Sequence, residues 1–328
     1  MDRSGKNVAI LGLGYQVPDA IRANDDPVFD HLKAHQPPNA DIFHGLKYRR
    51  VLRHPGDLVG LLVNAARTAV DQAKVPLDQV DMLLGSVSVG QYYSPNDLGA
   101  VHRDLGLSRH CRVIGLNNDD SNFIDGLRLA NDLVQCGTIR HALVICGNNW
   151  SHHVDYTEAV SHAASDGGGA AVIGWTDDAS RFRLVDWDSD TQTQYFGDLR
   201  MAHRASPHEG LFTTPLMKLD DERGAATVRT FGYHAPGPMV NRLLARNGLT
   251  GQDITLVPHQ TSWAVYDIWN EAIKPAHYIQ TIEELGDMVD SSVPVNLAKC
   301  HEEIKTDYLV LQAIGMEMST TALLYKRG

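Results

Sequence analysis

Two polar segments of the chain hold side chains that could do acid–base or nucleophilic chemistry. Asp119, Asp120 and Ser121 stand together just before a stretch with helical periodicity, and His259 follows the apolar run LVP. A serine hydroxyl is essentially un-ionised at neutral pH and attacks only beside a base, which His259 could supply. Aspartate and serine are also the residue types that cap helix N-termini, so a purely structural role stays open.

Other reactive groups form no comparable pattern. The four cysteines lie far apart without paired ligand spacing, so we interpret them as reduced, mostly structural thiols. His152, His153 and Asp155 have no second cluster to complete a metal site, and we expect loop histidines and no metal. The segment GLGYQVP (12–18) lacks the full dinucleotide fingerprint. No cofactor is predicted.

Composition narrows the classes of partner. The chain has 328 residues and a net charge of −11, which argues against nucleic acid or an anionic membrane as a partner. No apolar stretch reaches membrane-spanning length, and the first residues have no signal-peptide layout. We therefore expect a cytoplasmic protein.

Alternating strand and helix patterns must position these side chains. KNVAILGLG opens as a buried strand, residues 58–74 and 123–137 have helical spacing, and RHALVICGNN and GGGAAVIGW are strand runs. The glycine that ends the second helix suits a left-handed cap.

The pattern returns after about residue 180. GPMVNRLLARNGLTGQDITLVPHQ again gives helix, turn and strand, and DYLVLQAIG and TTALLYKR match the two earlier strand runs. We predict an α/β fold with two duplicated halves, residues 1–178 and 179–328. Two such halves suggest a five-layer αβαβα sandwich with two sheets.

Several segments together resemble the ketoacyl-ACP synthase III enzymes of the thiolase superfamily. LVPHQTSWAVYD (256–267) is similar to the family's Val-Pro-His-Gln-Ala-Asn segment, which carries its catalytic histidine. Weaker similarities run from the first strand to the last, in GLKYRR (45–50), SDGGGAAVIG (165–174) and QAIGMEMSTTALLYKR (312–327). The resemblance implies a thiolase-like fold and a catalytic His259.

The family places its nucleophilic cysteine at the start of a buried helix, where the helix dipole stabilises a thiolate. Gap-free alignment of VIGLNNDDSNFIDGLRLA (113–130) puts Asp120 at that position, and a shift of one residue puts Ser121 there. Neither is a thiol. Three alternatives remain: Ser121 is a nucleophile, Asp120 has a catalytic role such as a base toward an acceptor hydroxyl, or both residues only cap the helix.

A third position distinguishes condensing members, which pair the histidine with an asparagine. In GDMVDSSVPVN (286–296) the alignment puts Asp290 there. An ionised aspartate cannot donate a hydrogen bond, but it can orient His259 as the acid does in a Ser-His-Asp triad. That change suits acyl transfer to a hydroxyl, amine or thiol. The alternative for Asp290 is a helix cap.

The resemblance also implies an oxyanion hole and a docking surface. Backbone N–H groups at residues 120–121 and in Gly315-Met316-Glu317 would form the hole, where one donor is worth roughly 3 kcal/mol of barrier. We find no Trp near the entrance segment ADIFHGLKYRR, which weakens binding of coenzyme A. An acyl carrier protein is acidic, and a basic cluster in the segment could meet it; the alternative is a solvated face. The cluster comprises Lys47, Arg49, Arg50 and Arg53.

The sequence therefore predicts an acyltransferase of specialised metabolism. It would take an acyl group from a carrier protein, or from coenzyme A, and pass it to a hydroxyl, amine or second carrier thiol. We expect a homodimer, as in the family. Two alternatives stay open: a condensing enzyme with an altered nucleophile, and a non-catalytic partner of an active paralogue.

Overall fold

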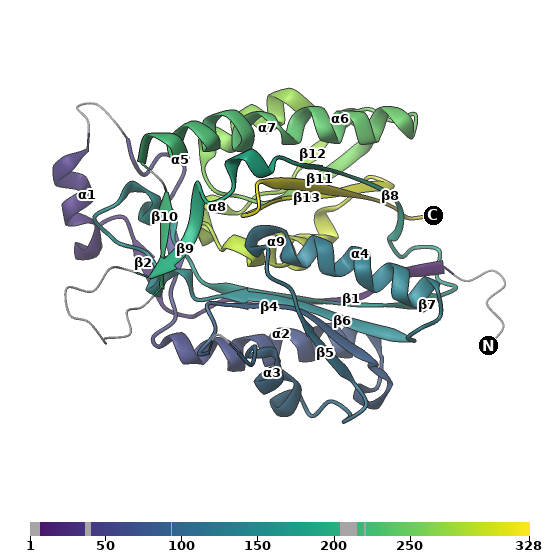
Figure 1. Ribbon diagram of the computed structural model, residues 1–328. Helices are drawn as coiled ribbons and strands as arrows, with labels where there is room; N and C mark the ends of the chain where they lie inside the picture. The colour runs from purple at the N-terminus through teal and green to yellow at the C-terminus, as the bar shows by residue number, and fades with distance from the viewer. Residues whose placement is uncertain (1–6, 37–40, 93, 204–214, 220) are drawn as a thin grey trace.

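The computed structural model describes residues 7–36, 41–92, 94–203, 215–219 and 221–328. Two five-stranded sheets form its frame (Figure 1). The first sheet has the order β1-β7-β6-β4-β5. Its strands, in that order, are β1 (Asn7–Gln16), β7 (Gly167–Thr176), β6 (His141–Asn148), β4 (Met82–Ser88) and β5 (Arg112–Gly115).

The second sheet repeats this plan. Its order, written from the same side, is β8-β14-β13-β11-β12, and the parallel and antiparallel pairs fall at the same places as in the first. Its strands are β8 (Arg183–Thr191), β14 (Ser319–Lys326), β13 (Tyr308–Gly315), β11 (Ile254–Pro258) and β12 (His277–Tyr278). The duplicated pattern in the sequence corresponds to two sheets of one topology. The boundary at residues 178 and 179 stays a prediction.

Helices separate and cover the sheets (Figure 1). Helices α4 (Asn122–Gln135) and α9 (Ser292–Lys299) lie between them. The outer face of the first sheet carries α2 (Leu58–Ala73) and α3 (Leu98–Leu105), and that of the second carries α6 (Pro236–Arg246) and α7 (Trp263–Ile273). This confirms the predicted thiolase-like arrangement of five layers.

Local sequence explains the close packing. A Cβ at Gly12 or Gly14 of β1 would collide with carbonyl oxygens of α2, so these glycines let the helix approach the strand. Helix α2 is followed by Lys74 at φ 54°, and α4 by Gly137 at φ 77°, which is the left-handed end that the sequence predicts.

Short strands and helices lie at one end of the two large sheets (Figure 1). Two small sheets pair β2 (Ile21–Ala23) with β3 (Tyr48–Arg50) and β9 (Leu199–His203) with β10 (Pro215–Leu219). The remaining helices are α1 (Asp30–His35), α5 (Asp221–Thr227), which continues into a π-helix at Val228–Gly232, and α8 (Ile282–Leu285). Among the described residues, no helix has both the length and the apolar character needed to cross a membrane.

Candidate active site

His259 comes directly after β11, at the carboxyl end of a parallel strand pair. Its backbone N–H donates to the carbonyl of Gln312 on β13 at 2.7 Å, which extends the β11–β13 pairing by one residue. The imidazole is only 2% exposed, and its Nδ1 has no hydrogen-bond partner within the described part of the chain. Nε2 lies 3.7 Å from Oδ2 of Asp120, beyond hydrogen-bond length. A buried base therefore faces a carboxyl group across a short gap.

The turn before α4 brings Asp120 to the histidine. Asp119 adopts φ 40°, an uncommon left-handed conformation for a residue with a side chain, and a one-turn 3₁₀ segment over Asp119–Ser121 follows. The side chain of Asp120 keeps 14% exposure, while Asp119 accepts from Ser88 Oγ at 3.0 Å. The turn thus presents a carboxyl group toward His259 and toward solvent.

Ser121 points into a different set of contacts. Its Oγ donates to Asp125 Oδ2 at 2.6 Å and accepts from Asn118 Nδ2 at 2.8 Å, and the residue is fully buried. Among the described residues, no hydrogen bond joins Ser121 to His259. Of the two candidates for the helix-start position, the structure brings Asp120, not Ser121, to the histidine.

The electrostatics of the site favour neutral forms. Burial lowers the pKa of His259 below its usual 6.5, against a smaller opposing effect of Asp287 and the Val289 backbone. Burial, aided by neighbouring Asp119, raises the pKa of Asp120 well above its usual value. The pKa of Asp287 is raised to about 7, chiefly by burial. At neutral pH the imidazole is therefore uncharged and able to accept a proton.

Asp287 interacts with His259 electrostatically, and sequence reasoning missed it. Its Oδ1 accepts from the Val289 N–H at 2.8 Å, so the carboxyl group is fixed in its own turn. The sequence assigned the orienting role to Asp290, but this side chain hydrogen-bonds to Ser86 Oγ and contacts Ser291 Oγ instead. The resemblance concerns only the asparagine position, which is that of Asp290. The spacing of the residues gives no sign that Asp287, three positions earlier, lies near His259.

Asn118 occupies part of the predicted oxyanion hole. Its carbonyl accepts from the Met316 N–H at 3.4 Å, and its Oδ1 accepts from the Glu317 N–H at 3.1 Å. A Cβ on Gly315 would collide with the Asn118 side chain, so the close approach requires this glycine. The N–H of Glu317 is therefore already paired, which differs from the role expected for it. Asn118 was not singled out from the sequence.

The basic cluster divides into buried and exposed members. Arg49 is 0% exposed, donates to the His162 carbonyl at 2.7 Å and stacks over Phe29 and Phe43. Burial lowers its pKa to about 10. Arg49 therefore holds the entrance segment to the body, and the expectation that it meets a carrier protein is wrong, because its guanidinium does not reach the surface.

The other three members of that cluster differ in exposure. Lys47 is exposed and paired with Glu283, Arg50 is partly buried, and Arg53 is exposed. The structure also brings Trp263, at the start of α7, against Gly45 and the edge of His44. A tryptophan thus lies beside the entrance segment after all. Sequence distance concealed it.

Among the described residues, no cysteine hydrogen-bonds to His259 or Asp120. Cys111, Cys146 and Cys300 are buried, and Cys136 is exposed just after α4. Burial raises the pKa of Cys111 to about 11 and that of Cys146 well above its usual value, so neither is a ready thiolate. Within the described ranges, no three His, Cys, Asp or Glu side chains are grouped to hold a metal ion.

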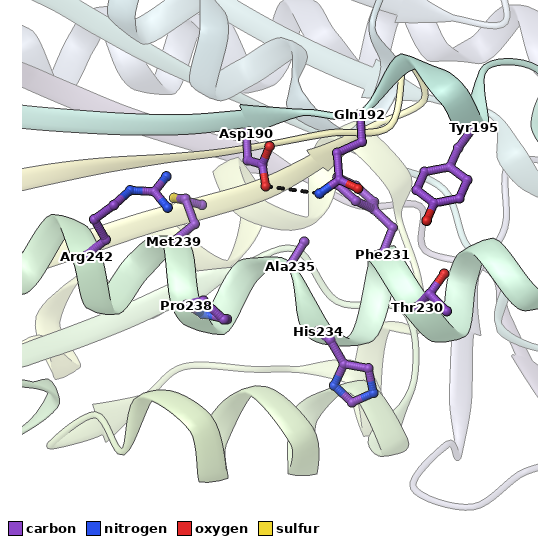
Figure 2. Close-up of a pocket in the computed structure, with 10 residues that line it drawn as sticks. All are labelled: Asp190, Gln192, Tyr195, Thr230, Phe231, His234, Ala235, Pro238, Met239 and Arg242. Carbon is purple, nitrogen blue, oxygen red and sulfur yellow. Dashed lines mark hydrogen bonds between the residues drawn. The ribbon is translucent and has the colours of Figure 1, made fainter.

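A pocket of about 300 Å³ lies elsewhere, between the end of β8 and the π-helix that leads into α6 (Figure 2). Figure 2 shows Tyr195 and Thr230 among its lining residues, and a hydrogen bond joins Asp190 to Gln192 at 3.1 Å. None of the site residues discussed above lines it.

Known proteins resemble this chain in sequence. Residues 115–192, which include the turn with Asp120, match the family described as 3-oxoacyl-acyl-carrier-protein (ACP) synthase III. A beta-ketoacyl-acyl-carrier-protein synthase III 1 of Bacillus cereus is 22% identical over 98% of this chain and 99% of its own length. The synthase III of Natranaerobius thermophilus is 25% identical, covering 93% of this chain and 94% of that protein.

Solved structures share the fold over nearly the whole chain. The 3-oxoacyl-(acyl carrier protein) synthase III of Pseudomonas aeruginosa superposes with a TM-score of 0.81, 24% identity and 98% coverage of both chains. OleA of Xanthomonas campestris, solved with lauric acid and lauroyl-CoA, gives 0.83 with 19% identity, covering 98% of this chain and 99% of that one. The protein therefore has a thiolase-like fold. Its sequence is similar to ketoacyl-ACP synthase III proteins over nearly the whole chain.

Proposed function

We propose that this protein is an acyltransferase that moves an acyl group from a carrier-protein or coenzyme A thioester to a hydroxyl, amine or second carrier thiol, without decarboxylation and without a cysteine nucleophile. One observation carries the proposal: a buried imidazole, uncharged at neutral pH, faces the carboxyl group of Asp120 across 3.7 Å at the start of α4. A base beside a carboxyl group suits proton removal from an acceptor.

In the proposed reaction, a lone pair of the acceptor's oxygen, nitrogen or sulfur attacks the thioester carbon. At the same time, His259 Nε2 takes the proton of that acceptor atom. The tetrahedral intermediate then collapses, the C–S bond breaks, and the imidazolium returns the proton to the leaving thiolate. Asp120 and Asp287 stabilise the transient positive charge on His259. The N-terminus of α4 lies where the oxyanion would form. No acyl-enzyme is required.

Two features argue against decarboxylative condensation. Asp290 lies where condensing members have the asparagine, and it hydrogen-bonds to Ser86 and contacts Ser291 instead of offering a free donor to a thioester carbonyl. In addition, the carboxylate of a malonyl donor would bring a negative charge into a site that holds several aspartates and, among the described residues, no Lys or Arg paired with them.

Ser121 as the nucleophile is the main mechanistic alternative. The only carboxyl group hydrogen-bonded to its hydroxyl among the described residues is Asp125, so that residue, not His259, would be the immediate proton acceptor. A non-catalytic partner subunit is a second candidate function. It is favoured by Asn118, which pairs the Met316 and Glu317 N–H groups that would otherwise serve an oxyanion.

Intact-protein mass measurement after incubation with acyl-loaded carrier protein tests these alternatives. Direct transfer predicts no acyl adduct, turnover that survives Ser121→Ala and loss of turnover in His259→Ala. A stable adduct that disappears in Ser121→Ala would identify covalent catalysis through Ser121. A carbon–carbon product from a malonyl donor would identify a condensing enzyme and overturn the proposal.

The partner-subunit alternative has its own experiment. Size measurement of the protein alone and with a cysteine-bearing homologue would detect a mixed assembly, and activity only in that assembly would favour it. The homodimer predicted from the resemblance would appear in the same measurement, as twice the 36.1 kDa chain mass.

A further inference from the structure

Four carboxyl groups belong to the two turns from which Asp120 and Asp287 approach His259. Asp119 and Asp120 come from the turn before α4, and Asp287 and Asp290 from the turn before α9. The two turns contact one another, and Asp290 lies close enough to both Asp119 and Asp120 to interact electrostatically, as Asp287 does with Asp120. The cluster therefore combines charges from both halves of the protein.

This cluster has no cation to balance it. Among the described residues, no Lys or Arg forms an ion pair with any of the four carboxyl groups, although arginine pairs are common elsewhere on the chain. The nearest potential cation is His259, which is uncharged at neutral pH for the reason given above. Several buried carboxyl groups without a counter-ion are costly unless they stay protonated or a cation joins them.

The histidine adds an independent observation. Its imidazole is only 2% exposed, yet Nδ1 has no hydrogen-bond partner among the described residues. Nε2 is directed at Asp120 across a gap too long for a hydrogen bond. A polar donor placed between them would satisfy both groups, and the partly exposed edge of Asp120 gives it access.

We propose that the acceptor of the acyl group is an amine, which enters as an ammonium ion and is held by Asp119, Asp120 and Asp287 beside His259. This inference rests on the proposed acyl transfer and narrows its acceptor. A neutral alcohol or thiol gains no charge pairing in this cluster, whereas an ammonium ion forms charge-assisted hydrogen bonds to carboxylates.

The chemistry balances without another reactant. The ammonium ion gives one proton to a carboxylate of the cluster, which passes it to solvent. The neutral amine attacks the thioester carbon and gives its second proton to His259 as the C–N bond forms. The C–S bond breaks, and the thiolate takes that proton to become a thiol. The products are an amide, a free thiol and one proton.

A binding measurement tests the inference without relying on turnover. The thermal midpoint of the protein is compared in butylammonium chloride, 1-butanol and sodium butyrate at equal concentration, with sodium chloride to match ionic strength. Butylammonium is expected to raise the midpoint most, because a ligand that binds the native state stabilises it. Equal shifts from butylammonium and butanol would overturn the inference.

A charge-removing variant sharpens that measurement. Asp119→Asn keeps a residue type that tolerates φ 40° and keeps an acceptor for Ser88 Oγ, but it removes one charge. It should lower the butylammonium affinity at least about fivefold, while the exposed control Asp267→Asn on α7 should not change it. Unchanged affinity in Asp119→Asn would contradict a role of this carboxyl group.

An assay of acyl transfer to different acceptors distinguishes an error in the amine inference from an error in the proposed acyltransferase function. Butyryl-pantetheine thioester is offered with butylamine, butanol or butanethiol, and rates without protein are subtracted. Preference for butylamine, about tenfold or more, supports the inference. Preference for butanol or butanethiol overturns it and leaves acyl transfer standing. Selective binding of butylammonium without any transfer overturns the proposed function and leaves the amine site standing.

Discussion

The turn before α4 and the turn before α9 are built alike and placed differently. Each starts from a left-handed residue with a side chain, Asp119 at φ 40° and Val289 at φ 48°, and each continues with Asp-Ser into a helix. In the first turn the aspartate, Asp120, keeps an exposed edge and faces His259.

In the second turn the equivalent aspartate is fully buried. Asp290 hydrogen-bonds to Ser86 of β4, and Ser291 donates to the Gly167 carbonyl at 2.9 Å. The same backbone conformation thus places Asp120 beside His259 in the first turn. In the second turn it places Asp290 and Ser291 in hydrogen bonds with strands of the first sheet. The two turns share a backbone conformation, and they differ in the burial of the aspartate, which decides its chemistry.

The largest expected effect concerns His259, the proposed base that Asp120 of the first turn faces. His259→Ala should lower the rate of acyl transfer about 10²–10⁴-fold, because it removes the proton acceptor. Steady-state rates with a butyryl thioester measure this. His234→Ala, an exposed histidine that lines the pocket of Figure 2, is the matched control and should keep wild-type rates. Similar losses in both variants would refute the base role.

The next effect compares the two aspartates directly. Asp120→Asn should lower kcat about a hundredfold, because an amide cannot ionise to stabilise the imidazolium as it forms. Asp290→Asn should lower kcat much less, since Asn still offers an oxygen to Ser86 Oγ and this side chain does not face His259. If Asp290→Asn has the larger effect, the orienting role expected from the sequence is restored.

A third prediction concerns stability and pH. The pKa of Asp287 is raised to about 7 in the folded protein and is near 4 when unfolded, so the folded state holds the proton more tightly between these values. The resulting stabilisation is present below pH 4 and is lost as the pH rises through 7.

Asp287→Asn should therefore stabilise the protein at pH 8 by about 2 kcal/mol relative to the wild type, and the difference should shrink toward pH 5. Urea unfolding at several pH values measures it. Asp267→Asn serves as the exposed control. A stability difference independent of pH would show that Asp287 does not titrate in this window.

The smallest effect concerns the serine beside Asp120. Ser121→Ala removes a buried hydroxyl that links Asn118 and Asp125, and should cost about 1 kcal/mol of unfolding free energy. Its transfer rate should stay close to wild type. A loss as large as that of His259→Ala would make Ser121 the nucleophile and reverse the comparison of the two residues.

The sequence predicted the architecture because its signals are local and repeated. Apolar runs and helical spacing in both halves correspond to strands and helices of two sheets with one topology. His259 was singled out because a compact segment of consecutive residues carries it, and the helix start was found from its polar residues.

The remaining features depend on contacts between distant segments. Arg49 sits in a run of basic residues, and only the packing of Phe29 and Phe43 against it reveals a buried cation. Asp287 and Asn118 lie at the site because of the conformations of their turns, and the spacing of residues along the sequence does not predict these conformations. The choice between Asp120 and Ser121 needed the left-handed Asp119, which sets the direction of each following side chain.

Asn118 joins pieces of chain from both halves. It pairs with Met316 and Glu317 on the final hairpin, and through its amide nitrogen with Ser121 and Ser319. The backbone carbonyl and the side chain of Asn118 thus join the loop that ends β13 to the first turn. A larger residue at Gly315 would push against the Asn118 side chain and so displace the turn that carries Asp120, although the atoms nearest to the added Cβ belong to Asn118 and not to Asp120.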